Sequence, residues 1–222
     1  MAASGSFIFN IGSSDLSKPD SITGQMNRYE IGLFDIENPK NKKDITDLEE
    51  FYIKYNIKES HIIFGRQFIN TPFINLQDGR MRPTAVVGLW SEINAIKKLH
   101  LEGGILYNIS PRSTIKWFSP GESIGVYATG VNIDGTKALY ADSLESKIIF
   151  IAGADWKPNK YFKLQVWELF THNIFNTVMI QTDIQYPFKK GSTLFASGQM
   201  IRQDAIKNGG NEDASKTYFE KN

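Results

Sequence analysis

The chain has no cysteine among its 222 residues, which excludes disulfides and thiolate metal sites. It also has no apolar run near the roughly 18 residues that a membrane-spanning helix needs. Charge of one sign does not dominate, because 25 Lys and Arg residues are balanced by 24 Asp and Glu residues. No general attraction to nucleic acid is therefore expected, and we predict no nucleic-acid partner.

Motifs that carry enzyme chemistry are missing as well. The chain has no Gly-rich phosphate loop, no Ser nucleophile elbow and no zinc-binding helix. Its three histidines, His61, His100 and His172, share no metal-ligand spacing. The sequence therefore predicts a protein that is not an enzyme and that uses no cofactor.

What the chain does contain is a series of segments, each about ten residues long, with alternating side chains. In the segment 162–167, apolar side chains share one face of an extended strand and mostly polar ones share the other. In the segment 178–186, one face holds Met179, Gln181, Asp183 and Gln185, and the other holds Val178, Ile180, Ile184 and Tyr186. A tilted strand of this length crosses a hydrocarbon core. The pattern predicts an all-β fold, an antiparallel transmembrane β-barrel with a polar lumen.

Ten strands are expected from this alternation and from the enrichment of aromatic and β-branched residues. They are Phe7–Ile11, Asn27–Phe34, Glu50–Lys58, His61–Phe68, Thr84–Ile93, Leu99–Asn108, Lys147–Trp156, Tyr161–Phe170, Thr177–Tyr186 and Thr193–Gln203.

The expected connections alternate in length. Tight turns are predicted at 59–60, 95–98, 157–160 and 187–192, and long loops at 67–83, at 110–146 and from 204 onward, with 171–176 as a short exception. The loop 110–146 is compatible with a hairpin above the membrane or with an irregular path. Short turns at one rim and long loops at the other are typical of outer-membrane barrels.

The two ends of the chain bear on its domain organisation. Residues 1–6 lack the basic and apolar regions of a secretory signal, and residues 207–222 are polar and indicate a loop. A barrel cannot end on a loop without an open strand edge. We therefore expect residues 1–222 to be a single domain and an interior fragment of a longer barrel, with the first and last strands missing. The alternative is a complete soluble domain with a disordered tail.

Two groups of residues resemble a known family. The first is Phe64-Gly65-Arg66-Gln67-Phe68-Ile69-Asn70-Thr71-Pro72-Phe73-Ile74-Asn75, followed by Asp78-Gly79-Arg80-Met81-Arg82-Pro83-Thr84. The second is Gly153-Ala154-Asp155-Trp156-Lys157-Pro158, with Leu164-Gln165-Val166-Trp167-Glu168 and Phe175-Asn176-Thr177-Val178 after it. Together these motifs cover about residues 52–203 and are similar to the OprD-type outer-membrane porins.

The resemblance implies a large barrel of about eighteen strands in the outer membrane of a Gram-negative bacterium. It implies passive, substrate-selective diffusion of small solutes, mostly carboxylate-bearing ones, past a constriction made by an inward-folded loop. The expected partners are outer-membrane lipid and small anionic or zwitterionic solutes, and a homotrimer is one arrangement to consider.

The leading candidates for solute binding are Arg80 and Arg82, which lie in the connection where the resemblance places the constricting loop. A planar guanidinium offers paired donors to a carboxylate. The alternative is that both side chains reach lipid headgroups or solvent. Asp78, in the same connection, is a candidate partner for a cationic solute group or a neighbouring arginine, unless it is only a solvated loop carboxylate.

Three further basic residues are candidates on the barrel wall. Side chains alternate between the two faces of a strand, and Arg66 falls on the same face as Ile62 and Phe64. This parity places it on the outer wall unless a β-bulge turns it inward. Lys54 and Lys163 have lumen parity, either as solute contacts or as ordinary parts of a wet wall.

Two other functions remain open at this point. One is a soluble all-β ligand-binding module of the carbohydrate-binding type, whose alternation would bury one face against a second sheet. The other is an outer-membrane barrel enzyme, which would need a catalytic cluster.

Overall fold

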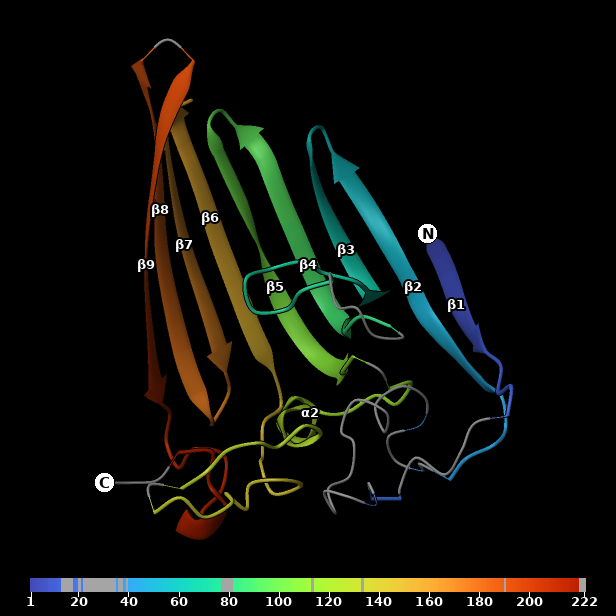
Figure 1. Cartoon of the computed structure of the whole chain (residues 1–222). Coiled ribbons are helices and arrows are strands. Elements are labelled where there is room, and N and C mark those ends of the chain that lie inside the picture. Colours follow the sequence, from blue (N-terminus) through green and yellow to red (C-terminus); the bar gives the residue numbers. More distant parts are fainter. Residues whose placement is uncertain are drawn as a thin grey trace.

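The computed structural model describes residues 1–12, 18–19, 21, 35, 38, 40–76, 82–112, 114–132, 134–189 and 191–219. Nine strands of this described part form one sheet in which each strand pairs with the next in sequence. They are β1 (Ala2–Ile8), β2 (Ile45–Ile57), β3 (Ser60–Gln67), β4 (Ala85–Ile96), β5 (Leu99–Ser110), β6 (Ile149–Asn159), β7 (Phe162–Thr171), β8 (Phe175–Lys189) and β9 (Ser192–Ala205). All pairs are antiparallel, and the sheet is a curved, open wall (Figure 1). The all-β prediction is confirmed.

The strand boundaries correct the sequence predictions at several places. β1 begins at Ala2 and ends at Ile8, so the prediction of a strand at Phe7–Ile11 was wrong. Pairing explains the shift, because β1 runs alongside β2 from Ala2 opposite Tyr52 to Ile8 opposite Ile45. The same pairing starts β2 at Ile45 instead of Glu50. The strand expected at Asn27–Phe34 lies outside the described residues.

A second correction concerns the tight turn that was expected at 157–160. β6 continues to Asn159, and the chain reverses at Lys160-Tyr161. Pro158 lies in a register shift between Trp156 and Asn159, where an interrupted ladder tolerates a residue without an N–H.

The two rims of the wall differ as predicted. The turn rim carries the two-residue turns Lys58-Glu59, Lys97-Lys98 and Lys160-Tyr161, together with the β8–β9 turn. Lys58 and Lys98 have positive φ angles of 54° and 67°, as tight hairpin turns require. The loop rim carries the long connections and helix α2 (Pro120–Gly125) (Figure 1).

The described part of the connection between β5 and β6 contains no strand and is largely irregular, apart from an isolated antiparallel bridge between Val131 and Lys137. Its one described α-helix, α2, starts at a capping box in which Ser119 and Glu122 bond each other's backbone N–H. The segment after β9 packs beneath this connection, with the ring of Tyr218 5.2 Å from Tyr140 and 5.3 Å from Phe175. No helix among the described residues is long and apolar enough to cross a membrane.

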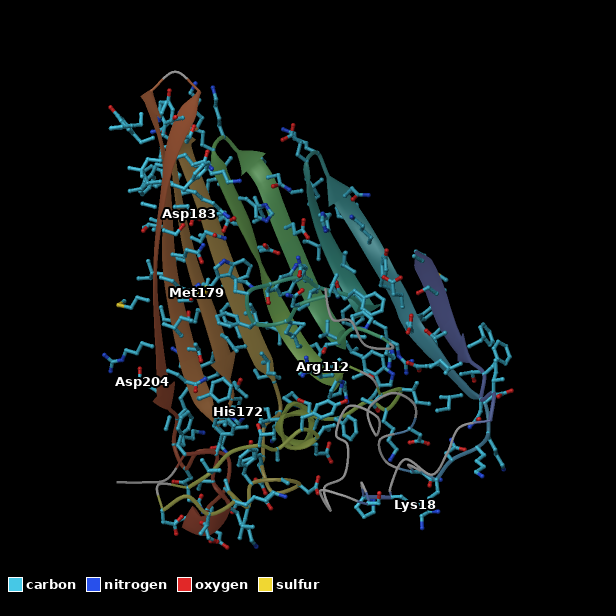
Figure 2. All side chains as sticks on the ribbon, viewed as in Figure 1. Lys18, Arg112, His172, Met179, Asp183 and Asp204 are labelled. Atoms are coloured by element: carbon cyan, nitrogen blue, oxygen red, sulfur yellow. The ribbon has the colours of Figure 1, made fainter. Side chains whose placement is uncertain are left out.

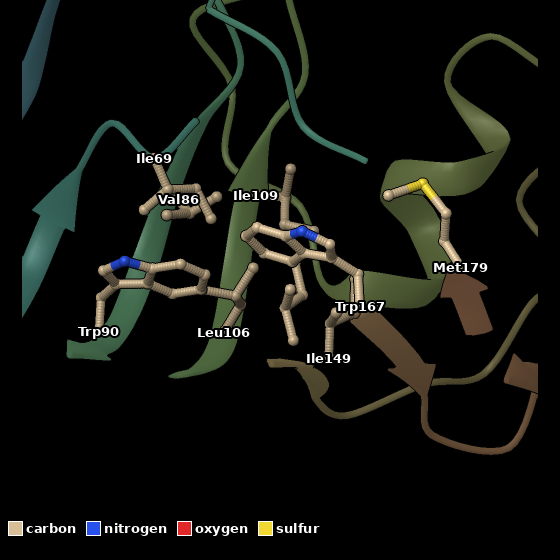
Figure 3. Packing of buried hydrophobic residues seen from close by; sticks show 9 residues of the cluster. Ile69, Val86, Trp90, Leu106, Ile109, Ile149, Trp167 and Met179 are labelled. Atoms are coloured by element: carbon tan, nitrogen blue, oxygen red, sulfur yellow. The ribbon is translucent and has the colours of Figure 1, made fainter. Parts of the chain in front are cut away.

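The two faces of the wall have different side chains. The inner wall carries a buried cluster that includes Trp90, Leu106, Trp167 and Met179, with Ile69 from the loop after β3 packed on it (Figure 3). The outer wall exposes a belt of large apolar side chains on which no described loop packs. On β2 and β3 these are Phe51, Ile53, Tyr55, Ile57, Ile62 and Phe64. The parity predicted for β8 agrees, because Met179 is 4% exposed inside and Ile184 is 46% exposed outside.

Candidate functional site: the inner wall and its inward loop

The loop that follows β3 lies against the inner wall, where it crosses β4 and β5 (Figure 1). Its described part is held by Ile69 in the buried cluster and by Phe73 and Ile74 packed against that cluster. Thr71 stiffens the turn, because its hydroxyl accepts hydrogen bonds from the backbone N–H groups of Phe73 and Ile74, at 3.2 and 2.9 Å. Apolar side chains thus hold the loop inside the curve of the sheet, as expected for a constricting loop.

A pocket of about 560 Å³ lies between this loop and the loop rim. Its lining is mostly apolar with one arginine; the residues are Phe73, Ile74, Asn75, Thr84, Ile109, Pro111, Arg112, Ser123, Ile124, Tyr127, Ile149, Leu169, Thr171 and Phe175. Arg112 lies at the loop-rim end of the wall beside α2 (Figure 2). Its guanidinium is 5.8 Å from the Tyr127 ring centre, and its carbonyl accepts a 2.6 Å hydrogen bond from the Tyr127 hydroxyl.

Arg82 is placed as an anchor of the inward loop. Its Nε donates to Glu49 Oε1 at 3.0 Å, its Nη2 lies 3.2 Å from Asp47 Oδ2, and its Nη1 donates to Ser110 Oγ at 2.8 Å and to the carbonyl of Thr114. The side chain is 2% exposed, so it has almost no surface to offer a solute in this arrangement. A solute-binding role for Arg82 remains a prediction, and the contacts themselves tie the loop to β2 and β5.

Arg66 reaches the loop rim without the bulge that was considered. The β2–β3 and β3–β4 registers are continuous across it, and the preceding Gly65 has a φ of 131°. Its Nη1 donates to the carbonyl of Leu48 at 2.7 Å and lies 3.7 Å from Asp47 Oδ1, and its guanidinium stacks over Trp117 at 4.6 Å. One third of its side chain stays exposed, at 34%.

The other predicted site residues are not brought together. Lys54 is exposed, has the parity opposite to Ile53 and Tyr55, and makes no ion pair within the described part of the chain. Lys163 pairs with Asp155 across the strands, with Nζ 3.0 Å from Oδ2. Arg80 and Asp78 lie outside the described residues.

A polar network on the inner wall was missed by sequence reasoning. His61 lies 3.7 Å from Glu92, and His100 lies 3.2 Å from Glu102, with Glu92 and Glu102 paired directly across β4 and β5. Farther along, Ser197 and Gln181 both donate to Asp183. Parity could have placed these side chains on one face, but the cross-strand register that pairs them was not predicted. No group of three side chains able to hold a metal ion occurs in the part of the chain that the structure describes.

Residues 22–218 match the family described as outer membrane porin, OprD family. The chain belongs to this family. The match covers nearly all of the wall, including the inward loop and the polar network, and it confirms the resemblance and the outer-membrane location. The family consists of channels, which favours a channel over an enzyme and gives no support to a soluble binding module.

Solved porins share the fold at low sequence identity. Pseudomonas aeruginosa OccK9 (OpdG) is 16% identical, with a TM-score of 0.66 over 91% of this chain and 46% of that one. P. aeruginosa OccK8 (OprE) is 16% identical, with a TM-score of 0.63 over 82% and 43%. Acinetobacter baumannii OccAB1 is 15% identical, with a TM-score of 0.61 over 93% and 42%. The chain thus spans less than half the length of these porins. No curated protein matches it significantly.

Proposed function

We propose that the protein gives small solutes passive, selective diffusion across the outer membrane, and that it favours solutes carrying a carboxylate, zwitterions included. The observation that carries the proposal is a difference in charge between the two ends of the wall: Arg66 and Arg112 lie at the loop rim, where Arg82 binds the carboxylates Asp47 and Glu49, and further carboxylates lie nearer the turn rim. Arg66 lies at the loop-rim end of β3, and the carboxylates Glu92, Glu102 and Asp183 lie nearer the turn-rim ends of their strands. Figure 2 shows the same separation for Arg112, at the loop rim, and Asp183.

This arrangement supports entry of solutes with two opposite charges. A carboxylate arriving from outside would meet the guanidinium groups first, and rings of charged side chains set selectivity in pores through the local field. An ammonium group on the same solute would next meet the carboxylates of the polar network. Lys163 is paired with Asp183 across β7 and β8 and lies 3.0 Å from Asp155, while Lys54 is exposed on β2.

The experiment is uptake by vesicles that contain the protein as its gene encodes it. Four probes of similar size are compared: glycolate as anion, glycine as zwitterion, acetamide as neutral solute and ethanolamine as cation. Glycolate and glycine are expected to enter several-fold faster than acetamide. The double variant Arg66→Gln with Arg112→Gln should remove most of the advantage of glycolate, while Lys160→Gln in a turn should leave it intact. Equal uptake of the four probes by the unchanged protein would refute the proposed selectivity.

A further inference from the structure

The turn rim carries positive charge that the described part of the chain does not neutralise. Its hairpin turns lie at the top of Figure 1 and include the segments 57–60, 96–99 and 157–161. These segments hold one acidic residue, Glu59, and five exposed lysines: Lys58, Lys97, Lys98, Lys157 and Lys160. None of the five lysines makes an ion pair with a described residue. Like charges gathered at one rim repel one another, so an anionic partner would be stabilised there.

Strand pairing brings three of these lysines together. Lys97 and Lys98 form the β4–β5 turn, and the backbone N–H of Lys157 donates a 2.8 Å hydrogen bond to the carbonyl of Lys98. The pairing of Leu99 with Trp156 continues this register into β5 and β6. Neighbouring strands lie about 4.8 Å apart, so the three flexible side chains can reach one phosphate group above the two turns.

An apolar row lies next to these lysines on the outer wall. Ile96 pairs with Leu99, Leu99 with Trp156, and Trp156 with Leu164. Ile96 is 48% exposed and Trp156 45% exposed, on the face opposite to the buried cluster of the inner wall. Aromatic side chains form girdles at the two interfaces of an outer-membrane barrel. The residue after Trp156, which is Lys157, therefore lies at the level of the lipid headgroups.

The lysines and the apolar row together match the two ends of a phospholipid. Short turns of outer-membrane barrels face the periplasm, so this rim meets the periplasmic leaflet. A lysine near an anionic membrane surface strengthens binding about fivefold. A free phosphate would use the lysines alone, whereas a lipid uses the lysines through its phosphate and the apolar row through its acyl chains.

We propose that the turn rim binds an anionic phospholipid. Its phosphate lies between Lys97, Lys98 and Lys157 and accepts charge-assisted hydrogen bonds from their ammonium groups. Its acyl chains cover the row from Ile96 to Leu164 and contact Trp156 on the way. The inference concerns the lipid contact of the outer wall and does not depend on which solute crosses the lumen.

Trp156 reports this contact directly, because bromine on an acyl chain quenches the fluorescence of a tryptophan that it touches. The protein as its gene encodes it is reconstituted in phosphatidylcholine vesicles that contain rising fractions of brominated phosphatidylglycerol or of brominated phosphatidylcholine. The signal of Trp156 is the difference between the unchanged protein and Trp156→Phe. Half of the quenching should need about a tenfold lower fraction of the anionic lipid than of the zwitterionic one. Equal fractions would overturn the proposal.

Two variants separate the turn-rim lysines from net charge. The turn-rim variant combines Lys97→Gln, Lys98→Gln and Lys157→Gln, and it should lose most of the preference for the anionic lipid. The matched control should keep the preference, although it removes the same charge from exposed lysines at the loop rim. It combines Lys137→Gln, Lys147→Gln and Lys207→Gln. A preference that survives in the turn-rim variant, or that is lost equally in both variants, would contradict the assignment.

Two further measurements need no change to the lysines. Raising the salt concentration from about 0.1 M to about 1 M shortens the Debye length from about 10 Å to about 3 Å and should remove most of the preference. Glycerol phosphate, a soluble analogue of the headgroup, should not displace the brominated lipid, because it has no acyl chains to cover the apolar row. A preference that ignores salt would count against the lysines. Displacement by glycerol phosphate would identify a site for free phosphate in place of a lipid site.

Discussion

Arg82 and Glu49 are joined by a 3.0 Å hydrogen bond from Nε to Oε1, which links the end of the inward loop to β2. The guanidinium is 2% exposed and the Glu49 side chain 15% exposed, so this is a largely buried pair. The two residues are separated by 33 positions in the sequence, and β3 and the inward loop lie between them. The pair therefore holds the loop in place from a distant strand.

Removing one partner of this pair should be costly. Arg82→Gln leaves Glu49 without its cation and leaves Asp47 with only Arg66, 3.7 Å away, and breaking a buried pair in this way costs about 3–5 kcal/mol. We expect a loss of that order in the free energy of unfolding, measured by urea titration of the protein folded into vesicles. Lys54→Gln, which removes an exposed cation, is the matched control and should change stability by less than about 0.5 kcal/mol. Similar stabilities for the two variants would contradict the anchoring role.

The two faces of β8 were predictable from the sequence, because the alternation of side chains along a strand is a local property, but the face of Arg66 stayed open. The roles of Arg82 and Arg66 were not predictable. Arg82 acts through Asp47 and Glu49, which come from a distant strand, and Arg66 depends on the unusual backbone at Gly65 and on Trp117 from another loop. Strand ends were missed because they also depend on distant residues. β2 begins at Ile45 because it pairs with β1 there, which its own composition does not indicate.

The outward and inward faces of β8 can be distinguished by charge. Ile180 pairs with Val166 and Met200 on the outer wall, and Gln181 pairs with Gln165 and Gln199 on the inner wall. Ile180→Arg should destabilise by about 2–4 kcal/mol if the site lies near the bilayer midplane, and Gln181→Arg should cost much less. Urea titration of the protein folded into vesicles measures the free energy of unfolding of both variants. Equal losses of stability would contradict the assignment of faces.

Gly65 is predicted to be irreplaceable by alanine. Its φ is 131°, and a Cβ there would lie 2.3 Å from the carbonyl oxygen of Phe51. Gly65→Ala should cost about 1–3 kcal/mol through backbone strain and should displace Arg66 from Trp117. Gly198→Ala is the control, because its Cβ would meet nothing nearer than 3.7 Å. A neutral Gly65→Ala would show that β2 and β3 can separate at no cost.

The local stability of the first turn of α2 should depend on pH. Hydrogen bonds from the Ser119 hydroxyl, and then from its backbone N–H, lower the pKa of Glu122 below its ordinary value of 4.5. A carboxylate with a lowered folded pKa stabilises above its unfolded pKa and loses that effect as the pH falls through the folded pKa. The protection factors of residues 119–125, corrected for the intrinsic pH dependence of amide exchange, should therefore fall as the pH drops below the ordinary pKa of 4.5. Glu122→Gln should abolish this pH dependence, and Ser119→Ala should quicken exchange already at pH 7. A pH response that survives in Glu122→Gln would assign it to another group.

The central claim, a wall with one wet and one lipid-facing side, is tested most directly by single cysteines in this cysteine-free chain. Lys54→Cys and Ile53→Cys are neighbours on β2 with opposite parity, and Gln181→Cys and Ile180→Cys repeat the comparison on β8. Each variant is reconstituted in a planar bilayer and treated with a water-soluble, charged thiol reagent while the channel current is recorded. Positions 54 and 181 should react and reduce the current, while 53 and 180 should remain unmodified. Modification at 53 and 180, or equal reaction at all four positions, would contradict the account.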